Sequence, residues 1–228
     1  SHSSPGQPGS QGNGHGKAPA PSDLPRHKGV LLLNLGTPDA PDTAAVRRYL
    51  REFLADPEVI KLPRRMRWFN KPLAALIAQF RGPRSAHAYN SIWTDRGSPL
   101  KVITEDQVAG LQKMLPNGWK VFYAMRYGNP SVARVLEEIE AAGVEQLVVI
   151  PMYPQYSGPT TGTAIADLYE QLRNHPGALH VTIRTAWYDD VNYIDAQAQL
   201  IADLAKRKGL EPSNCFLLYS AHSMPQSY

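Results

Sequence analysis

Short apolar runs that alternate with amphipathic segments are the feature that most constrains how this chain folds. Each run is only a few residues long and mostly apolar, as in GVLLLNLG, which is typical of strands covered on both faces. The runs lie at 29–36, 120–125, 146–152, 180–188 and 215–220. Strands of this kind, separated by helical segments, predict a parallel sheet in a doubly wound, Rossmann-like α/β fold.

The segments between the runs have apolar residues at helical spacing. After the first run, Val46 and the apolar residues four, seven and eight positions later form one face, with Asp42 or Thr43 as the N-cap and Asp56 at the end. After the second run, Ser131 caps a similar segment. We expect helices within 42–56, 130–143, 163–173 and 193–209.

The first 28 residues differ in composition from the rest of the chain. They are rich in Gly, Pro and Ser and lack the apolar core of a signal peptide. A segment of this composition cannot bury enough apolar surface to offset the entropy lost on ordering. We therefore predict a disordered tail at 1–28, with the folded part starting at Gly29.

The formal charge of +4 is concentrated in one stretch. Residues 61–84 contain seven basic side chains and no acidic one, so the other residues hold 17 basic and 20 acidic side chains. A nucleic-acid-binding protein is expected to have a broad basic face, so no nucleic-acid partner is predicted. Cys215 is the only cysteine, and no apolar stretch reaches the roughly 18–20 residues that span a bilayer. These features predict a cytoplasmic protein.

Polar and aromatic side chains follow the predicted strands at the points where the strands end. Arg126 and Tyr127 follow the second run, Tyr153 follows the third, Trp187 stands near the end of the fourth and His222 follows the fifth. Ligands of doubly wound folds bind outside the carboxyl ends of the strands. Flat aromatic rings together with a guanidinium suit a large, planar and anionic ligand. The residues therefore predict a ligand site at this edge of the sheet.

Common cofactor and hydrolase motifs do not fit. The loop after the first run lacks the GxGxxG spacing that brings a backbone against a pyrophosphate, and no GxxxxGK[ST] phosphate loop occurs. His222 is flanked by Ser220 and Ser223, but no GxSxG elbow is present. A serine hydrolase is therefore not supported.

The sequence around these residues resembles the ferrochelatases. The resemblance rests on LLNLGTPDAPDTAAVRRYLREFLADPEVI, GSPL, AMRYGNP, PMYPQYS followed by TTGT, and YSAHSMP, which occur in family order from about Gly29 to the end. It implies a lyase of haem and porphyrin biosynthesis that inserts Fe²⁺, as substrate metal, into protoporphyrin IX, or into coproporphyrin III as in some bacteria. Gly158 stands where animal enzymes carry an iron–sulfur cysteine, so no iron–sulfur cluster is expected.

The family fold consists of two similar α/β domains around a porphyrin cleft. By this resemblance, 29–186 is the first domain and 187–228 is the start of an incomplete second domain. The family's second catalytic residue, a glutamate on a later strand, would lie beyond Tyr228. We therefore expect little chelatase activity from the 228-residue chain by itself.

The resemblance also assigns roles to individual residues. His222 matches the family's active-site histidine, which acts either as an iron ligand or as the acceptor of a pyrrole proton. A neutral imidazole suits both roles. Arg126 would pair with a propionate, and tyrosine rings would hold the face of the macrocycle. The positions that match the porphyrin-contacting loops are Leu35, Tyr89, Ser98, Arg126, Tyr127 and Tyr153.

The basic stretch 61–84 has two possible roles. It is amphipathic and contains Trp68, so it could lie on an anionic bilayer and give a peripheral contact with the inner membrane. Alternatively it is a helix packed over the cleft with a solvated face; in the family this region forms a lip over the porphyrin, which fits either role. A non-catalytic porphyrin- or haem-binding module is an open alternative, the choice between the two porphyrins is open, and the oligomeric state is unknown.

Overall fold

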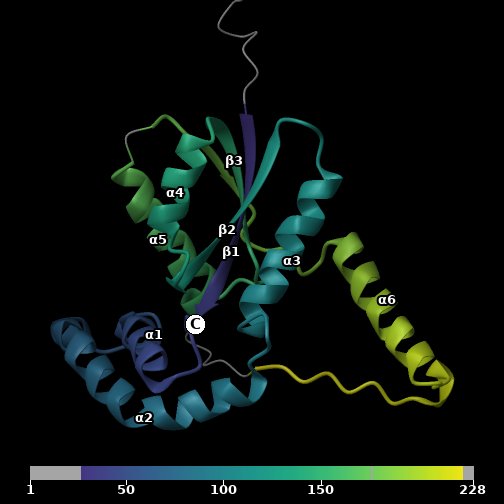
Figure 1. Cartoon of the computed structure of the whole chain (residues 1–228), viewed down its shortest axis with the longest axis horizontal. Helices are drawn as coiled ribbons and strands as arrows, with labels where there is room; N and C mark the ends of the chain where they lie inside the picture. The colour runs from purple at the N-terminus through teal and green to yellow at the C-terminus, as the bar shows by residue number, and fades with distance from the viewer. Residues whose placement is uncertain (1–26, 176, 223–228) are drawn as a thin grey trace, which may run out of the picture.

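The computed structural model describes residues 27–175 and 177–222. Its centre is a four-stranded sheet in the order β2-β1-β3-β4 (Figure 1). The strands are β1 (His27–Thr37), β2 (Trp119–Gly128), β3 (Val144–Pro151) and β4 (His180–Ile183). All three neighbouring pairs are parallel, so the predicted parallel α/β sheet is confirmed. β1 begins within the stretch predicted as a disordered tail, and 1–26 of that stretch lie outside the described residues.

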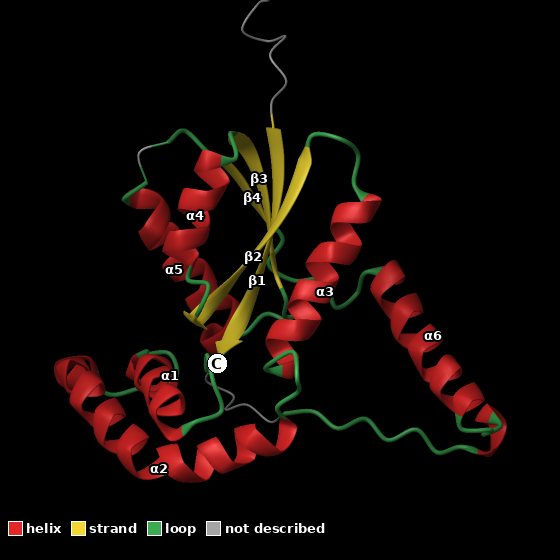
Figure 2. Cartoon of the chain, in the orientation of Figure 1, coloured by secondary structure: helices red, strands yellow, loops and turns green. Residues whose placement is uncertain are grey.

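Helices flank both faces of the sheet and lie across its carboxyl end. α4 (Val132–Ala141) and α5 (Thr163–Arg173) cover one face, and α3 (Pro99–Met114) packs on the other against β1 and β2 (Figure 2). α1 (Thr43–Ala55) and α2 (Asn70–Ile92) pack against each other below the strand ends, and α6 (Val191–Arg207) stands apart from the body. Three short helical turns are η1 (Arg64–Phe69), η2 (Gly158–Gly162) and η3 (Pro212–Asn214).

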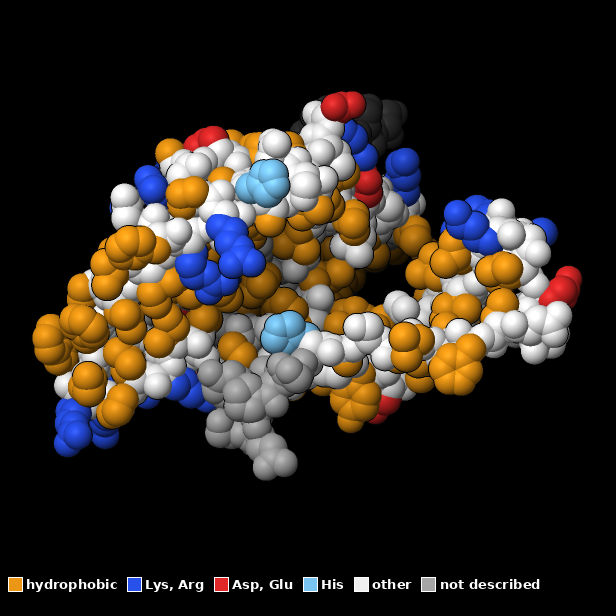
Figure 3. All heavy atoms as spheres, turned by 90° about the horizontal axis from the view of Figure 1, so that it is seen from below, with side chains coloured by type: hydrophobic (Ala, Val, Ile, Leu, Met, Phe, Trp, Pro, Cys, Tyr) orange, Lys and Arg blue, Asp and Glu red, His pale blue; other side chains and the backbone are white. Residues whose placement is uncertain are grey.

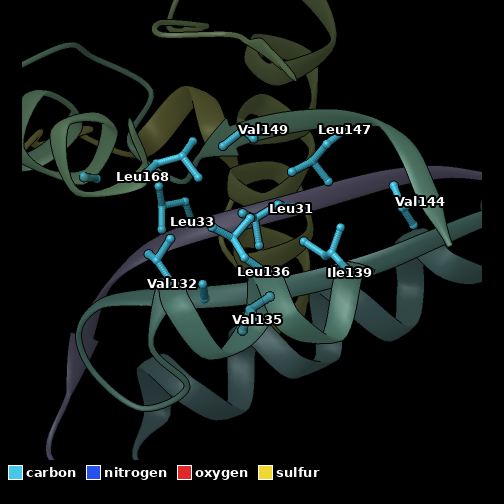
Figure 4. Packing of buried hydrophobic residues seen from close by; sticks show 12 residues of the cluster. Leu31, Leu33, Val132, Val135, Leu136, Ile139, Val144, Leu147, Val149 and Leu168 are labelled. Carbon is cyan, nitrogen blue, oxygen red and sulfur yellow. The ribbon is translucent and has the colours of Figure 1, made fainter. Parts of the chain in front are cut away.

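The main core lies between the sheet and the helices α4 and α5. Leu31 and Leu33 of β1 face this side together with Leu147 and Val149 of β3 (Figure 4). The opposing stripe of α4 consists of Val132, Val135, Leu136 and Ile139. Full burial of one such side chain contributes roughly 1.5–3 kcal/mol.

β1 is also buried on its other face, which is why its sequence is apolar at successive positions. Val30 and Leu32 are only 5% and 4% exposed. The one polar residue at this level, Asn34, is paired: its Nδ2 atom donates to Thr104 Oγ1 of α3 at 3.0 Å. A buried amide with a partner avoids the cost of an unsatisfied polar group.

Side-chain caps fix the starts of two helices. Asp42 Oδ1 accepts hydrogen bonds from the backbone N–H groups of Ala44 and Ala45 at 2.8 and 3.0 Å, so Asp42 rather than Thr43 is the N-cap of α1. Ser131 Oγ accepts one from Arg134 N at 3.4 Å at the start of α4. Each cap typically contributes about 1 kcal/mol. The helices predicted within 42–56, 130–143, 163–173 and 193–209 are all present.

α2 packs against α1 through small side chains. Its buried positions recur every four residues, at Asn70, Ala74, Ala78, Gly82 and Ala86. A Cβ atom at Gly82 would lie 2.5 Å from Arg47 Cγ, so the two helices approach too closely there for a larger residue. The larger apolar residues of α2 divide between the two sides, since Ile77 and Tyr89 pack against the same core whereas Phe80 is 76% exposed.

The predicted fifth strand at 215–220 is wrong. The segment is irregular, and Phe216 and Tyr219 are 93% and 79% exposed. It runs back below the strand ends instead of beside β4 (Figure 1), so its backbone meets no neighbouring strand within the described residues. A strand without a partner leaves its backbone hydrogen-bonding groups to water.

The predicted fourth strand is shorter than expected. β4 ends at Ile183, five residues before the end of the predicted run. Trp187 then crosses the end of β3, where its Nε1 atom donates to Pro151 O at 3.0 Å and its backbone N–H donates to Pro154 O at 2.9 Å. The chain therefore leaves the sheet to reach α6.

α6 is present, but none of its residues is buried. The apolar residues predicted to form one face of this helix are largely open to solvent, with Leu200 60% and Leu204 50% exposed. Within residues 27–175 and 177–222, no helix has both the length and the apolar character needed to cross a membrane.

Leu136→Ala should lower the free energy of unfolding by about 2–5 kcal/mol, because it leaves a cavity between α4 and the sheet. The matched control is Ile103→Ala on α3, where the side chain is 56% exposed. The control should change the free energy by less than about 0.5 kcal/mol. Urea unfolding followed by circular dichroism measures both variants, and equal losses would contradict the assigned core.

Candidate functional site

The loops of the candidate site leave the sheet where β1 and β2 end side by side. Gly36 of β1 pairs with Tyr127 of β2. The φ angle of Gly36 is 111°, and a Cβ atom there would lie 1.7 Å from the backbone oxygen of Tyr127. Only glycine fits this position, since other residues would clash and rarely adopt this φ angle. Gly36 therefore allows the ends of both strands to stay close.

Asp56, directly after α1, is the centre of a buried polar cluster. Its Oδ2 atom accepts hydrogen bonds from Arg126 Nη2 at 2.7 Å, from the Tyr127 hydroxyl at 2.9 Å, and from the Thr163 hydroxyl. Its Oδ1 atom accepts one from the backbone N–H of Glu58 at 2.8 Å. The cluster joins the end of α1, the end of β2 and the start of α5.

The pKa of Asp56 is lowered despite its burial. Burial alone raises the pKa of a carboxyl group. The hydrogen bonds from Thr163, Glu58 and Tyr127 and the charge of Arg126 favour the carboxylate and outweigh this effect. Asp56 is therefore ionised at neutral pH and needs these partners to remain so.

Arg126 is bound mainly by internal partners. Its Nε atom donates to the backbone oxygen and the hydroxyl of Thr163 at 3.1 and 2.9 Å, and its Nη1 atom lies 3.8 Å from Asp167 Oδ2. The guanidinium lies over the ring of Tyr127, 4.5 Å from its centroid. The side chain is 19% exposed, so a substrate carboxylate would share Arg126 with two acidic residues.

An aromatic cluster brings Tyr89 and Tyr127 into one neighbourhood. Tyr49 stacks on Phe53 with centroids 6.1 Å apart and meets Tyr89 edge-on at 6.3 Å. Phe53 meets Tyr127 edge-on at 5.2 Å, and Leu35 packs against the same cluster. Burial raises the pKa of Tyr49, Tyr89 and Tyr127, so their hydroxyl groups are neutral at neutral pH.

Ser98 lies inside the protein rather than on the wall of a cavity. It is 3% exposed, and its hydroxyl shares a hydrogen bond of 2.7 Å with the Thr37 hydroxyl. Thr37 is the last residue of β1. Ser98 therefore connects the loop before α3 to the end of β1.

A cavity with a volume of about 1320 Å³ is lined by both Tyr153 and His222. Its other walls are the loop 152–157, one side of α6 and the segment 215–221. Seen from below, a hollow with mostly hydrophobic walls lies between the body and α6 (Figure 3). Two of the predicted residues, from distant parts of the sequence, therefore share one cavity.

The hydroxyl of Tyr153 is buried and has no hydrogen-bond partner among the described residues. An unsatisfied buried hydroxyl costs roughly 1–3 kcal/mol, which a bound ligand or water would recover. Burial raises the pKa of Tyr153, with a smaller contribution from Tyr127. The group is therefore a neutral donor at neutral pH.

The comparisons with known proteins identify the family. The family model described as Ferrochelatase matches residues 27–228. The chain belongs to the ferrochelatase family. It is 45% identical over 200 residues to a ferrochelatase of Neisseria meningitidis serogroup B, covering 87% of this chain and 57% of that protein. A ferrochelatase of Pseudoalteromonas atlantica is 42% identical over 204 residues, covering 88% of this chain and 55% of that protein.

A third relative is a ferrochelatase of Alcanivorax borkumensis. It is 40% identical over 208 residues, which cover 90% of this chain and 60% of that protein. The chain thus spans somewhat more than half the length of these curated ferrochelatases.

Sequence reasoning missed Asp56 and Thr163 as members of the polar cluster of this ferrochelatase-family chain. Asp56 was interpreted only as the end of a helix, and Thr163 only as the start of another. No local pattern connects them, because they are 107 positions apart. In the sequence, Asp56 stands at the end of a predicted helix and Arg126 follows a predicted strand. These positions alone do not indicate that the two side chains are in contact.

Asp56→Asn should lower the free energy of unfolding at neutral pH by about 3–5 kcal/mol, because it removes the nearer of the two carboxylates that pair with the mostly buried Arg126 and leaves only Asp167, at 3.8 Å. The folded pKa of Asp56 is depressed. The stabilisation is therefore complete above the unfolded value near 3.8 and is lost as pH falls through the folded value.

Urea unfolding from neutral to acidic pH measures this difference. Asp106→Asn is the control, because its ion pair with Arg96 lies on the surface, and it should change stability little at any pH. A difference between the wild type and Asp56→Asn that stays constant down to the lowest pH would contradict the assignment.

Proposed function

We propose that the protein to which this chain belongs is a ferrochelatase that inserts Fe²⁺ into protoporphyrin IX to form protohaem. The observation that carries the proposal is the cavity shared by Tyr153 and His222 in a member of this family. Its relatives of 40–45% identity carry the name ferrochelatase. The size and hydrophobic walls of the cavity suit a large flat ligand.

His222 is the catalytic residue of the proposal. Insertion of Fe²⁺ requires two pyrrole N–H groups to lose their protons, after which the four ring nitrogens hold the metal. A neutral imidazole accepts such a proton or holds Fe²⁺ on its way in. Within residues 27–175 and 177–222, no three His, Cys, Asp or Glu side chains meet as a metal site.

The remaining predicted residues hold the macrocycle in this proposal. Tyr153 presents its ring to the ligand, supported by its place in the cavity, while its hydroxyl is buried. Leu35 and Tyr89 belong to the wall built around α1, and the fully buried Tyr127 supports that wall from inside. Arg126 does not line this cavity, and its N–H groups that Asp56, Asp167 and Thr163 leave free are proposed to pair with a propionate at the edge of the macrocycle. Clamping the ring out of plane would expose the nitrogen lone pairs.

Ser98 and Gly158 have supporting parts. Ser98 positions the end of β1, because its hydroxyl group is hydrogen-bonded to that of Thr37. Gly158 offers no thiolate, and a Cβ atom there would lie 3.4 Å from Glu58 Oε2. We therefore assign no iron–sulfur cluster to this position, because such clusters are held by cysteine thiolates.

The division into a first domain at 29–186 and the start of a second at 187–228 belongs to the same proposal. At the proposed boundary, Trp187 is hydrogen-bonded to Pro151 at the end of β3 and to Pro154 in the loop that follows. Beyond it, α6 buries none of its residues. A helix with an open apolar stripe is expected to pack against another layer.

The stretch 61–84 is proposed to contact the inner membrane peripherally from the cytoplasmic side. Its support is the exposure of Trp68 and Phe80, each 76%, and of Leu76, 56%, among the seven basic side chains. Aromatic and aliphatic groups enter the interfacial layer, and cations pair with anionic lipids.

His222→Ala, in the protein that spans the full length of its relatives, should reduce the rate of iron insertion by about 100-fold or more, because the proton acceptor is lost. His87→Ala on α2 is the control and should retain activity. The assay follows the porphyrin spectrum with Fe²⁺ and is run with both protoporphyrin and coproporphyrin. Undiminished turnover by His222→Ala would remove the catalytic role, and faster turnover of coproporphyrin would reassign the substrate.

Trp68→Ser with Phe80→Ser should weaken binding to anionic vesicles by about tenfold or more, because both side chains leave the lipid interface. High salt should weaken the wild type as well. Vesicle sedimentation measures this, with Ile103→Ser plus Met114→Ser, exposed by 56% and 82% on α3, as the control. If the wild-type protein does not sediment with anionic vesicles at low salt, the proposed membrane contact is contradicted.

A further inference from the structure

A groove of about 630 Å³ lies between α1 and the first turns of α2. Its charged lining consists of four basic side chains, Arg48, Arg51, Lys71 and Arg126, and two acidic ones, Glu52 and Asp56. We call it the basic groove. It is separate from the cavity of Tyr153 and His222, with which it shares no lining residue.

The acidic side chains near the basic groove are already engaged. Asp56 accepts the hydrogen bond of Arg126, and Glu52 accepts one from the backbone N–H of Gly128 at 3.0 Å. Asp42, whose pKa is lowered chiefly by the backbone N–H of Ala45 and to a lesser extent by Arg48, caps α1.

The three basic side chains at the mouth of the groove are unpaired. Across residues 27–175 and 177–222, neither Arg48, Arg51 nor Lys71 makes an ion pair or a side-chain hydrogen bond. All three are exposed. With four basic and two acidic side chains in its lining, the groove has an excess of positive charge.

The groove opens next to the exposed aromatic residues of η1. Lys71 follows Phe69 by two positions, and Trp68 and Phe69 are 76% and 37% exposed. They pack edge to face, with ring centroids 5.6 Å apart. Aromatic side chains beside cations are typical of surfaces that meet the headgroup layer of a bilayer.

We propose that the basic groove binds the phosphate headgroup of an anionic phospholipid while Trp68 and Phe69 enter the adjoining lipid. Guanidinium groups pair with phosphate oxygens through two parallel hydrogen bonds, and Lys71 adds a third cation. The inference rests on the proposed membrane contact of 61–84 and adds to it a specific headgroup site, whose two arginines lie outside that stretch on α1 and whose lysine, Lys71, lies within it. A free phosphate would use the same cations but not the aromatic neighbours.

Flotation with phosphatidylcholine vesicles, with and without phosphatidylglycerol, tests the proposal in the absence of porphyrin. The groove variant is Arg48→Gln, Arg51→Gln and Lys71→Gln. The control, Lys206→Gln, Arg207→Gln and Lys208→Gln at the end of α6, removes the same charge. Each cation at a membrane surface contributes about 1 kcal/mol, so the groove variant should lose roughly 100-fold in partition to the anionic vesicles.

The control should stay within about threefold of the wild type, because cations far from a bilayer interact weakly with it. Equal losses in both variants would mean diffuse attraction and would overturn the site. Thermal unfolding shows that each variant is folded, and Lys71→Gln alone, on an exposed residue, provides a milder change with the same expected direction.

A soluble short-chain phosphatidylglycerol and inorganic phosphate distinguish the source of the phosphate. Tryptophan fluorescence should respond to the lipid at concentrations where inorganic phosphate has no effect. Equal responses to both would overturn the lipid assignment. If the Trp68 and Phe80 variant loses vesicle binding but the groove variant does not, the result supports the membrane contact of 61–84 and contradicts the headgroup site in the basic groove. Porphyrin binding without any vesicle binding removes both membrane proposals and leaves the ferrochelatase proposal intact.

Discussion

One buried carboxylate, that of Asp56, connects the elements that meet at the carboxyl end of the sheet. Asp56 accepts hydrogen bonds from Arg126 at the end of β2 and from Thr163 at the start of α5, partners that are 70 and 107 positions away in the sequence. With 5% side-chain exposure, the carboxylate has lost most of its water, and only a paired cation and several donors make that favourable. The same guanidinium packs over Tyr127, so the polar cluster and the aromatic cluster support each other.

This arrangement separates two tasks within the candidate site. The tyrosines beside α1 are neutral and Asp56 is paired with Arg126, so the charge of these groups does not change near neutral pH. Tyr153 and the exposed His222 share the large cavity, which these groups do not line. The first set supports the loops at the strand ends, and the second lines the space in which a ligand is proposed to bind.

The sequence was sufficient where local physics decides the outcome. The doubly apolar run of β1, the N-cap Asp42 and the helix at 163–173 all follow from short-range patterns, and all are present. The sequence was insufficient where contacts between residues far apart in the chain determine the structure. The run at 215–220 has strand composition but no strand beside it within the described residues, and α2 packs on α1 mainly through alanines and a glycine, with Ile77 and Tyr89 beside them. Predicted site residues such as Ser98 and Arg126 proved to be bound by partners that no motif indicates.

A crystal structure of the chain with protoporphyrin bound tests the central claim most directly. We expect a macrocycle in the cavity between the loop 152–157 and His222, in contact with Tyr153, while the ion pair of Asp56 and Arg126 remains intact. A macrocycle bound elsewhere on the surface, or one that reaches its site only after Arg126 leaves Asp56, would contradict it.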